Sequence, residues 1–547
     1  MYRRHVLPLC LLLAALIAGY ASLPPAPLPA TAPPGVFSTG RALADIAVLA
    51  RAPHPVGSAA HAAAAEHVLA RMRALGLEVR EQAALERGYP VRNLVGVLPG
   101  RDRGLPPLAL MAHYDSVPGS PGAADDSTGV AVALEVARAL RAGPPPLRDV
   151  ARVITDGEEV DLLGARAFHE QDPLARRIGL VLNMEARGGG GRVFMFETSD
   201  GNGPLIDVFR RVTPHPSSNS LAVYVYRHMP NDTDFTVVRG HGGNGLNYAF
   251  IGRQVDYHAP TSTPARLDAG SVQHMGNQVL AAARAFAFAA ALPPRGADRV
   301  YADVLGIGVL AYAPAAGWAI ALLAALLLAD AARRLKRVQP LRLRSLAAGA
   351  CAAFLVLPAA AGLALALRHL AGVPYGFEAQ RPLLAAFGRY ELALALAGLG
   401  SALLLAAVPR RADWSAWLGA LLVALVVVLA AQAAVPAIAF LPGWPLLLAA
   451  GTLWLACLRR ADPGPGPRGT LIAAGATLAL AQCLYLAHAV LLGVGANLPA
   501  AAGLFAWLGA ASLFPLLQST GSRRAGALAG LAALLAAVAL AASFRVH

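Results

Sequence analysis

Residues 113–159 place imidazole and carboxylate side chains directly after short apolar segments. The stretch reads His113-Tyr114-Asp115, then Gly122-Ala123-Ala124-Asp125-Asp126-Ser127-Thr128-Gly129, and then Asp156-Gly157-Glu158-Glu159. Four apolar runs of strand length lead to such residues: Leu108–Ala112 before His113, Val150–Thr155 before Glu158 and Glu159, Gly179–Met184 before Glu185, and Leu246–Ile251 before His258. Segments with helical periodicity, such as Ser127–Arg141, lie between these runs. This alternation predicts an α/β sandwich with a mostly parallel central sheet.

In such sheets, ligands bind beyond the carboxyl ends of the strands, where all of these polar residues are expected. Zinc is held by His, Asp and Glu at about 2.0–2.2 Å. Two zinc ions about 3.5–4 Å apart need a carboxylate that bridges them, because an imidazole offers one nitrogen to one metal. Asp125 suits the bridging role. The remaining candidate ligands are His113 with Glu185 and Glu159 with His258, although the residues alone leave this pairing open.

Two further acidic residues have candidate roles beside the ligands. Asp115 lies two residues after His113 and can accept the second N–H of its imidazole. Glu158 is next to a candidate ligand and is the expected general base, which takes a proton from the attacking water and passes it to the leaving amine.

Each of these motifs also has a purely structural interpretation. Asp125-Asp126 could cap the helix that follows, the two glutamates could be solvated, and His258 could occupy a turn. A metal site is favoured because all of these interpretations would have to hold together. Other histidines are expected on the surface or in loops: His61, His67, His169, His215 and His241. His54 either lines the cleft or belongs to a structural turn.

The composition predicts that much of the chain lies in lipid. Of 547 residues, 56% are hydrophobic and 14% are charged, and the mean hydropathy is +0.52. The formal charge of +14 does not indicate nucleic-acid binding, because the arginine clusters lie between apolar runs. The cysteines also lie in apolar runs, so neither a disulfide framework nor a thiolate metal site is expected: Cys10, Cys351, Cys457 and Cys483.

The expected order of domains begins with an N-terminal transmembrane signal anchor, residues 1–23, for which a cleaved secretory signal is the alternative. A Pro-rich linker (24–35) without a core, a zinc peptidase domain (36–293) and an all-α multi-span membrane domain (304–543) should follow. About eight spans are expected in the last part: 304–330, 345–368, 387–408, 414–435, 438–458, 469–494, 499–518 and 525–543.

The basic clusters predict the orientation of these spans. Arg3-Arg4, Arg333–Arg337, Arg410-Arg411, Arg459-Arg460 and Arg523-Arg524 all fall on one side if the spans alternate. The positive-inside rule then places the N-terminus in the cytoplasm and the peptidase domain on the periplasmic or extracytoplasmic side. The Ala- and Arg-rich composition favours a bacterial inner membrane.

The motifs together resemble those of the co-catalytic di-zinc aminopeptidases, metallopeptidase family twenty-eight. They are His113-x-Asp115, Gly122-Ala123-x-Asp125-Asp126, Glu158-Glu159, Asn183-x-Glu185 and Tyr257-His258-x-Pro260. Further elements resemble its membrane-bound branch, which includes the endoplasmic reticulum metallopeptidase and vacuolar membrane proteases: Pro53–Ser58, Phe196–Ser199, Pro230–Phe235 and Gly245–Phe250. The sequence departs from the common pattern at Glu185, where many members have Asp, and at Asp126-Ser127 in place of Asp-Asn.

The resemblance implies a three-layer α/β/α zinc-exopeptidase sandwich with two Zn²⁺ per chain. His113, Asp125 and Glu185 would bind one ion, and Asp125, Glu159 and His258 the other, with Glu158 as base and Asp115 as the residue that orients His113. The expected function is a membrane-anchored aminopeptidase, with a peptide substrate and the lipid bilayer as partners and no nucleic acid. A glutaminyl-cyclase-like acyl transferase with one zinc is one alternative. A membrane scaffold or transporter with a peptidase-like ectodomain is another.

Overall fold

The computed structural model describes residues 2–338, 340–407, 414–457, 467–517 and 523–546. The chain forms two compact units. The α/β unit comprises Leu23–Ala311, and the helical unit comprises Met1–Ser22 with Tyr312–His547.

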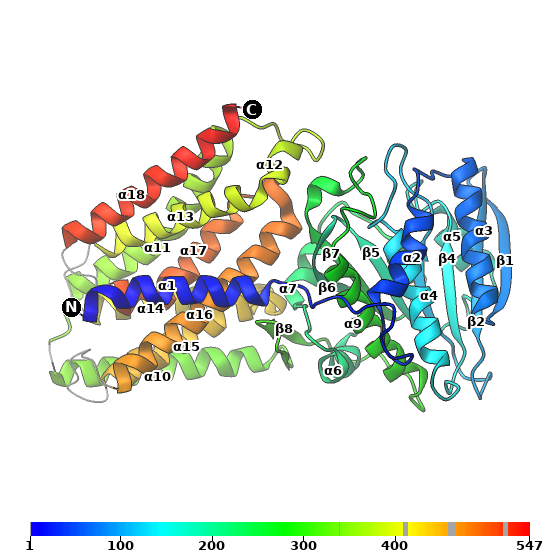
Figure 1. Ribbon diagram of the computed structural model, residues 1–547. Helices are drawn as coiled ribbons and strands as arrows, with labels where there is room; N and C mark the ends of the chain where they lie inside the picture. The colour runs from blue at the N-terminus through cyan, green and yellow to red at the C-terminus, as the bar shows by residue number, and fades with distance from the viewer. Residues whose placement is uncertain (1, 339, 408–413, 458–466, 518–522, 547) are drawn as a thin grey trace. The chain divides into compact units, whose positions relative to one another are not determined.

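A seven-stranded mixed sheet, in the order β1-β2-β4-β3-β5-β7-β6, forms the centre of the α/β unit (Figure 1). The strands are β1 Glu78–Glu86, β2 Tyr89–Leu98, β3 Leu108–His113, β4 Val150–Thr155, β5 Leu180–Ala186, β6 Gly190–Thr198 and β7 Gly245–Gly252. β4, β3, β5 and β7 run parallel to one another, whereas β1, β2 and β6 pair in the antiparallel sense. The predicted α/β fold with a parallel centre is confirmed, and the antiparallel edges make the sheet mixed.

Helices cover both faces of the sheet and produce three layers. One hydrophobic core lies under α2 (Thr39–Leu49), α3 (Ala59–Ala74), α4 (Ser127–Arg141) and α9 (Ala269–Ala287). A second core lies under α5 (Leu163–Gln171) and α8 (Asp234–Gly240). Every residue of β3, β4 and β5 is buried, as expected for parallel strands that are covered on both faces.

The remaining elements of the α/β unit include two strands, β8 and β9, where the sequence analysis predicted the start of a membrane helix. α6 (Gly203–Val212), α7 (Ser220–Tyr226) and the short helix η1 (Gln254–Asp256) lie in the second half of the unit. β8 (Val300–Val304) and β9 (Gly308–Tyr312) form a two-stranded sheet. The prediction that the first membrane run starts at residue 304 is therefore wrong. The turn at Gly306, with φ +68°, reverses the chain there, and α10 begins only at Ala316.

The Pro-rich segment 23–37, which we call the strap, is hydrogen-bonded to the α/β unit. Arg41 donates to the carbonyl oxygens of Ala30 and Ala32, at 2.7 and 2.8 Å. Arg138 donates to Pro34 O at 2.7 Å, and Arg284 donates to Gly35 O. The predicted linker, residues 24–35, contributes no residue to the first core, whereas Phe37 at the end of the strap, which was predicted to lie in the peptidase domain, is buried in that core.

The helical unit consists mainly of apolar helices. They are α1 Tyr2–Ala21, α10 Ala316–Val338, α11 Leu343–Leu370, α12 Arg381–Ala385, α13 Phe387–Ala406, α14 Trp414–Ala434, α15 Phe440–Cys457, α16 Pro467–Val494, α17 Ala501–Leu517 and α18 Arg523–Ala542. Among the described residues, five segments are long and apolar enough to cross a bilayer: Ala316–Arg337, Leu343–Leu370, Trp414–Ala434, Ile472–Val494 and Arg524–Ala542. The chain is therefore an integral membrane protein.

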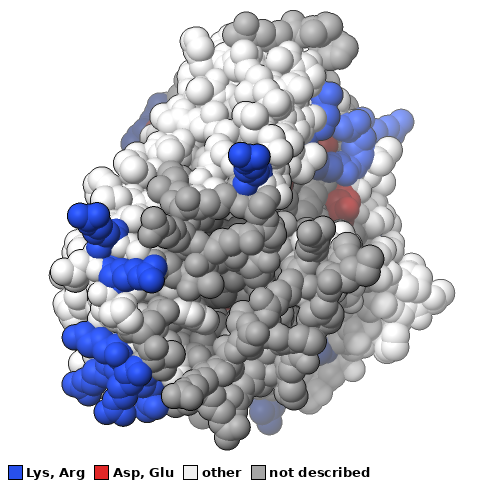
Figure 2. All heavy atoms as spheres, turned by 90° about the vertical axis from the view of Figure 1, so that its left-hand side faces the viewer, with Lys and Arg blue, Asp and Glu red and all other residues white. Residues whose placement is uncertain are grey.

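Basic residues gather at one end of the helical unit. α10 ends with Lys336 and Arg337 in its last turn, and Arg342 and Arg344 lie at the start of α11. Figure 2 shows the corresponding face, on which Lys and Arg are frequent and Asp and Glu are rare. The predicted clusters Arg410-Arg411 and Arg459-Arg460 lie outside the described residues.

Candidate metal centre

The four parallel strands bring the predicted ligands to one edge of the sheet. His113 is the last residue of β3, and Glu185 lies near the end of β5. Glu158 and Glu159 occupy the turn after β4, and His258 follows β7 and η1. Because β4, β3, β5 and β7 are adjacent, their carboxyl ends meet in one place.

Asp125 lies between the two imidazoles. Its Oδ1 is 3.1 Å from His113 Nε2, and its Oδ2 is 3.1 Å from His258 Nε2. Glu159 Oε1 is 3.0 Å from His258 Nε2, and Glu185 Oε2 is 3.8 Å from His113 Nε2. Three groups of potential ligands result, and two of them share Asp125: His113 with Asp125 and Glu185, and Asp125 with Glu159 and His258. The third group is His113 with Glu158 and Glu159. Within each group the ligand atoms lie within 4.8 Å of one another.

The chemistry of this cluster fits divalent metal ions. His113 is 0% exposed, and Asp125 and Glu185 are each 6% exposed, so the charges are removed from water. Glu159 Oε1 is buried, and its partner at 3.0 Å is His258 Nε2, the same nitrogen that faces Asp125 Oδ2 at 3.1 Å. Buried carboxylates that outnumber their imidazole neighbours need additional positive charge. Imidazole and carboxylate ligands without thiolate suit zinc.

The pKa directions in the cluster reflect the same excess of acid. Burial raises the pKa of Glu158 and Glu185 well above the ordinary value, and neighbouring carboxylates add to this increase. Burial also acts to raise the pKa of Asp125, but hydrogen bonds from His113 and His258 outweigh it and hold that pKa far below normal. Burial lowers the pKa of His258, and its bonds to Asp125 and Glu159 reverse this and raise it to about 10. The buried carboxylates thus share the two imidazoles, His113 and His258, as their sources of positive charge.

Asp115 connects the end of β3 to the turn after β4. Its Oδ1 lies 3.3 Å from His113 Nδ1, which is the contact that the sequence predicted. The same carboxylate accepts hydrogen bonds from the backbone N–H groups of Glu158 and Glu159, at 3.1 and 3.2 Å. Asp115 therefore fixes the turn that carries both glutamates, a contact that the sequence reasoning missed.

The two adjacent aspartates before α4 have different positions. Asp126 is the N-cap of α4, and its Oδ1 accepts a hydrogen bond from Gly129 N at 2.9 Å. The capping interpretation thus applies to Asp126, whereas Asp125 turns into the cluster.

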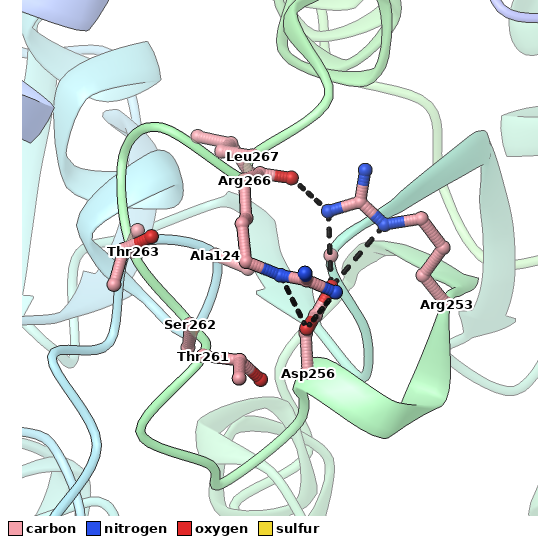
Figure 3. A pocket seen from close by; sticks show the side chains of 10 residues that line it. Ala124, Arg253, Asp256, Thr261, Ser262, Thr263, Arg266 and Leu267 are labelled. Atoms are coloured by element: carbon pink, nitrogen blue, oxygen red, sulfur yellow. Dashed lines mark hydrogen bonds and ion pairs between the residues drawn. The ribbon is translucent and has the colours of Figure 1, made fainter. Parts of the chain in front are cut away.

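The loop that carries His258 is held by a second acidic residue that the sequence reasoning missed. Asp256 is 1% exposed and pairs with Arg253 at 3.0 Å and Arg266 at 3.1 Å (Figure 3). Gly189 packs against this group so closely that a Cβ there would lie 2.6 Å from Asp256 Oδ2. The ion pairs lie beside a small pocket lined by Ala123, Ala124, Gly189, Arg253, Asp256, Thr261, Ser262, Thr263, Arg266 and Leu267. We call the ion pairs of Asp256 with Arg253 and Arg266 the Asp256 clamp. Only a glycine at position 189 leaves room for this clamp.

Two other histidines lie near the cluster, and one of them corrects a prediction. His61 was expected on the surface but is 8% exposed, with Nε2 2.8 Å from Asp156 Oδ1 and its ring stacked on Tyr114. Its position in the first turn of α3, after the N-cap Ser58, points it inward. His54 is buried and joins a turn, because Ser116 Oγ accepts a hydrogen bond from its backbone N–H at 3.0 Å.

The fold and this cluster define the class of metal-dependent hydrolases with an α/β architecture. Residues 93–283 match the family model described as Peptidase family M28. The chain therefore carries a peptidase M28 domain, and all five predicted ligands lie within the matched residues.

Curated relatives with membrane-related names also match part of the chain. Endoplasmic reticulum metallopeptidase 1 of Mus musculus is 34% identical over 230 residues, which cover 41% of this chain and 26% of the relative. The vacuolar membrane protease of Candida dubliniensis is 30% identical over 247 residues, which cover 42% of this chain and 26% of the relative. The chain thus matches about a quarter of the length of these curated relatives.

Among solved structures, a zinc aminopeptidase from Bacillus subtilis is similar at 15% sequence identity and a TM-score of 0.38, and the match covers 46% of this chain and 96% of the other.

Proposed function

We propose that this protein is a membrane-anchored di-zinc metallopeptidase that acts as an aminopeptidase and removes N-terminal residues from peptides. The position of Asp125 supports this proposal most strongly. One of its carboxylate oxygens faces each imidazole at 3.1 Å, which suits a bridge between two ions. The match of residues 93–283 to the M28 peptidases supports peptide hydrolysis as the reaction.

The proposed ligand sets follow the two groups that share Asp125. His113, Asp125 and Glu185 would hold one zinc, and Asp125, Glu159 and His258 the other. Bound zinc supplies Lewis acidity, which polarises the peptide carbonyl and makes water more acidic. Asp115 would keep the ring of His113 in position through the contact at Nδ1.

Glu158 is the proposed general base. Its Oε2 lies 3.9 Å from His113 Nε2, at the cluster but outside the two proposed ligand sets. Burial, reinforced by Glu185 and Glu159, raises its pKa well above normal, which favours a carboxylate that takes up a proton. It would accept the proton of the attacking water and deliver it to the amine nitrogen as the C–N bond breaks.

The location of this activity is also part of the proposal. The basic residues at the end of α10 and the start of α11 favour a cytoplasmic position for that end of the helical unit. We place the N-terminus in the cytoplasm and the peptidase domain on the periplasmic or extracytoplasmic side, with a bacterial inner membrane as the expected location.

Metal content and substrate preference together test the proposal. The full chain in detergent or nanodiscs would be analysed for bound zinc and assayed on aminoacyl amides and on matched peptides with blocked N-termini. Two zinc ions per chain and cleavage of free N-termini alone would support it. Cleavage of blocked peptides would refute the aminopeptidase assignment, and absence of bound zinc after zinc loading would refute the metal centre.

The two alternatives predict different results in the same assay. A cyclase-like acyl transferase would use one zinc and join the α-amine of an N-terminal glutamine to its side-chain amide carbon with release of ammonia, without hydrolysing a peptide bond. A scaffold or transporter would bind no catalytic metal. A transporter would use charged side chains inside its membrane helices, and in the helical unit the carboxylate of Glu391 is paired with His488 Nδ1 at 2.9 Å. The comparisons favour neither alternative, because the matched family is a family of peptidases.

A further inference from the structure

Three polar side chains lie side by side on β5, β7 and β6, inside the α/β unit. Asn183 on β5 is in register with Asn247 on β7, and Asn247 is in register with Glu197 on β6. All three residues are 0% exposed. Buried polar groups on central strands are costly unless they are hydrogen-bonded. None of the three belongs to the proposed ligand sets, so their presence needs a separate explanation.

Hydrogen bonds connect these residues into a chain that ends at Glu185. Asn183 Nδ2 donates to Glu185 Oε1 at 3.2 Å and to Asn247 Oδ1 at 3.0 Å. Asn247 Nδ2 in turn donates to Glu197 Oε2 at 3.0 Å. At the outer end, Arg239 Nη1 donates to Glu197 Oε1 at 2.7 Å. We call this series Arg239–Glu197–Asn247–Asn183 the polar ladder.

An irregularity in β6 brings Glu197 into the ladder. Met195 pairs with Tyr248, but the register then shifts, and Glu197 rather than Phe196 pairs with Asn247. A bulge of this kind changes the direction in which a side chain points. Without the extra residue, Phe196 would face Asn247, and the ladder would have no acid at its outer end.

The carboxylate of Glu197 fixes the direction of every hydrogen bond in the ladder. An ionised carboxylate can only accept, so Asn247 must turn its NH₂ group toward Glu197 and its oxygen toward Asn183. Asn183 must then present its own NH₂ group to that oxygen and to Glu185. Arg239 balances the charge of Glu197, with which it forms an ion pair at 2.7 Å.

The contact with Glu185 separates the functions of its two oxygens. Oε1 accepts the hydrogen bond from Asn183, while Oε2 faces the cluster at 3.8 Å from His113 Nε2. A glutamate has one more rotatable bond than an aspartate and therefore needs more restraint to present one oxygen to a metal ion. Hydrogen-bonded partners of ligating carboxylates provide such restraint.

We propose that Glu197, Asn247 and Asn183 are positioning residues that orient the Glu185 carboxylate for metal binding through the polar ladder. This inference rests on the proposed function, because it assumes that Glu185 is a ligand. It gives a role to residues of the motifs Phe196–Ser199 and Gly245–Phe250, which the ligand sets leave unexplained.

Two ladder variants and one control test the proposal in the full chain in detergent. Asn247→Leu removes the central amide at similar size, and Glu197→Gln removes the charge that orders the amides. Gln278→Met is the matched control. Gln278 is also 0% exposed, and its Nε2 donates to Val193 O at 2.9 Å, outside the ladder. Zinc affinity would be measured by competition with a chromogenic chelator, kcat and KM on an aminoacyl amide, and Tm on each variant.

The ladder variants should lose about 10–100-fold in affinity for one of the two zinc ions and a similar factor in kcat, with KM changed less than about twofold. The control should lower Tm alone. Wild-type zinc affinity and kcat in both ladder variants would overturn the inference, whatever their Tm. If Asn247→Leu does not fold, the isosteric Glu197→Gln variant decides. A wild-type chain that binds no zinc would refute the proposed function itself, and the two failures are thus distinguishable.

Discussion

Two buried arginines, four residues apart, should respond to the same substitution with opposite changes in stability. Arg152 on β4 is 0% exposed, and only its Nη1 has a described acceptor, Val150 O at 2.7 Å, while Nε and Nη2 have none. Arg148 is 1% exposed, but it donates to the carbonyl oxygens of Pro106 at 2.9 Å and Phe286 at 3.0 Å. We expect Arg152→Met to stabilise the α/β unit and Arg148→Met to destabilise it.

The magnitude for Arg152 follows from its electrostatic environment. Burial lowers the pKa of its guanidinium from 12.5 to about 9, which corresponds to a cost of roughly 5 kcal/mol for keeping the charge at neutral pH. Methionine removes that cost but also loses one hydrogen bond and some packing. Replacing a buried charge that has poor partners by an apolar side chain stabilises proteins by about 1–4 kcal/mol. We therefore expect about 2 kcal/mol, or a rise in Tm of about 4–8 °C.

Arg148→Met should lower stability by about 3 kcal/mol, because it leaves several buried carbonyl groups without their donor. Differential scanning calorimetry of the full chain in detergent, at saturating zinc, would measure both variants. The transition that shifts when zinc is removed reports on the α/β unit, because a ligand stabilises the unit that binds it. A lower Tm for Arg152→Met, or equal shifts for both variants, would refute the reasoning.

Four other outcomes are expected. Glu158→Gln should lower kcat by about 10²–10⁴-fold and leave bound zinc unchanged; appreciable turnover would contradict its role as base. Gly189→Ala should displace the Asp256 clamp, since its Cβ would lie 2.6 Å from Asp256 Oδ2, and should reduce zinc content toward one ion per chain, as measured by mass spectrometry. Burial lowers the pKa of His274 to about 3, so below pH about 6.5 the unfolded chain binds a proton that the folded chain refuses. Stability should fall by up to about 1.4 kcal/mol per pH unit between about pH 6 and 4 from this group and show no such loss above about pH 7, and His274→Gln should flatten that slope in denaturant titrations. Removal of zinc by a strong chelator should lower the Tm of the α/β unit, because mutual repulsion then acts on the buried carboxylates; an unchanged Tm would argue against an internal metal centre.

The helix Ser127–Arg141 shows which features a sequence can predict. Its predicted and observed bounds agree because the signals are local: a capping aspartate before it and a regular apolar face along it. β4 also has its predicted bounds, and β3 ends one residue later than predicted, at His113; both are short apolar runs between polar turns. β6 was missed because it begins with glycines and contains a bulge, which interrupt the alternation that marks a strand.

The candidate site could be predicted as far as its chemistry depends on residue type. The predicted ligands all lie at the carboxyl ends of the parallel strands. Four of the five end or follow an apolar run, and Asp125 lies in the turn before α4. The supporting contacts could not be predicted in this way. The pairing of Asp256 with Arg266 and the ladder from Arg239 to Asn183 depend on the order of strands and on loop paths.

The strap has a consequence for the sequence of events during synthesis. Its carbonyl groups are bound by Arg41, Arg138 and Arg284, which belong to α2, α4 and α9. The last of these arginines leaves the ribosome about 250 residues after the strap itself, so the strap cannot complete its contacts until most of the α/β unit has been made. Its docking is therefore a late step, and resistance of the strap to a protease would mark the molecules that have finished folding.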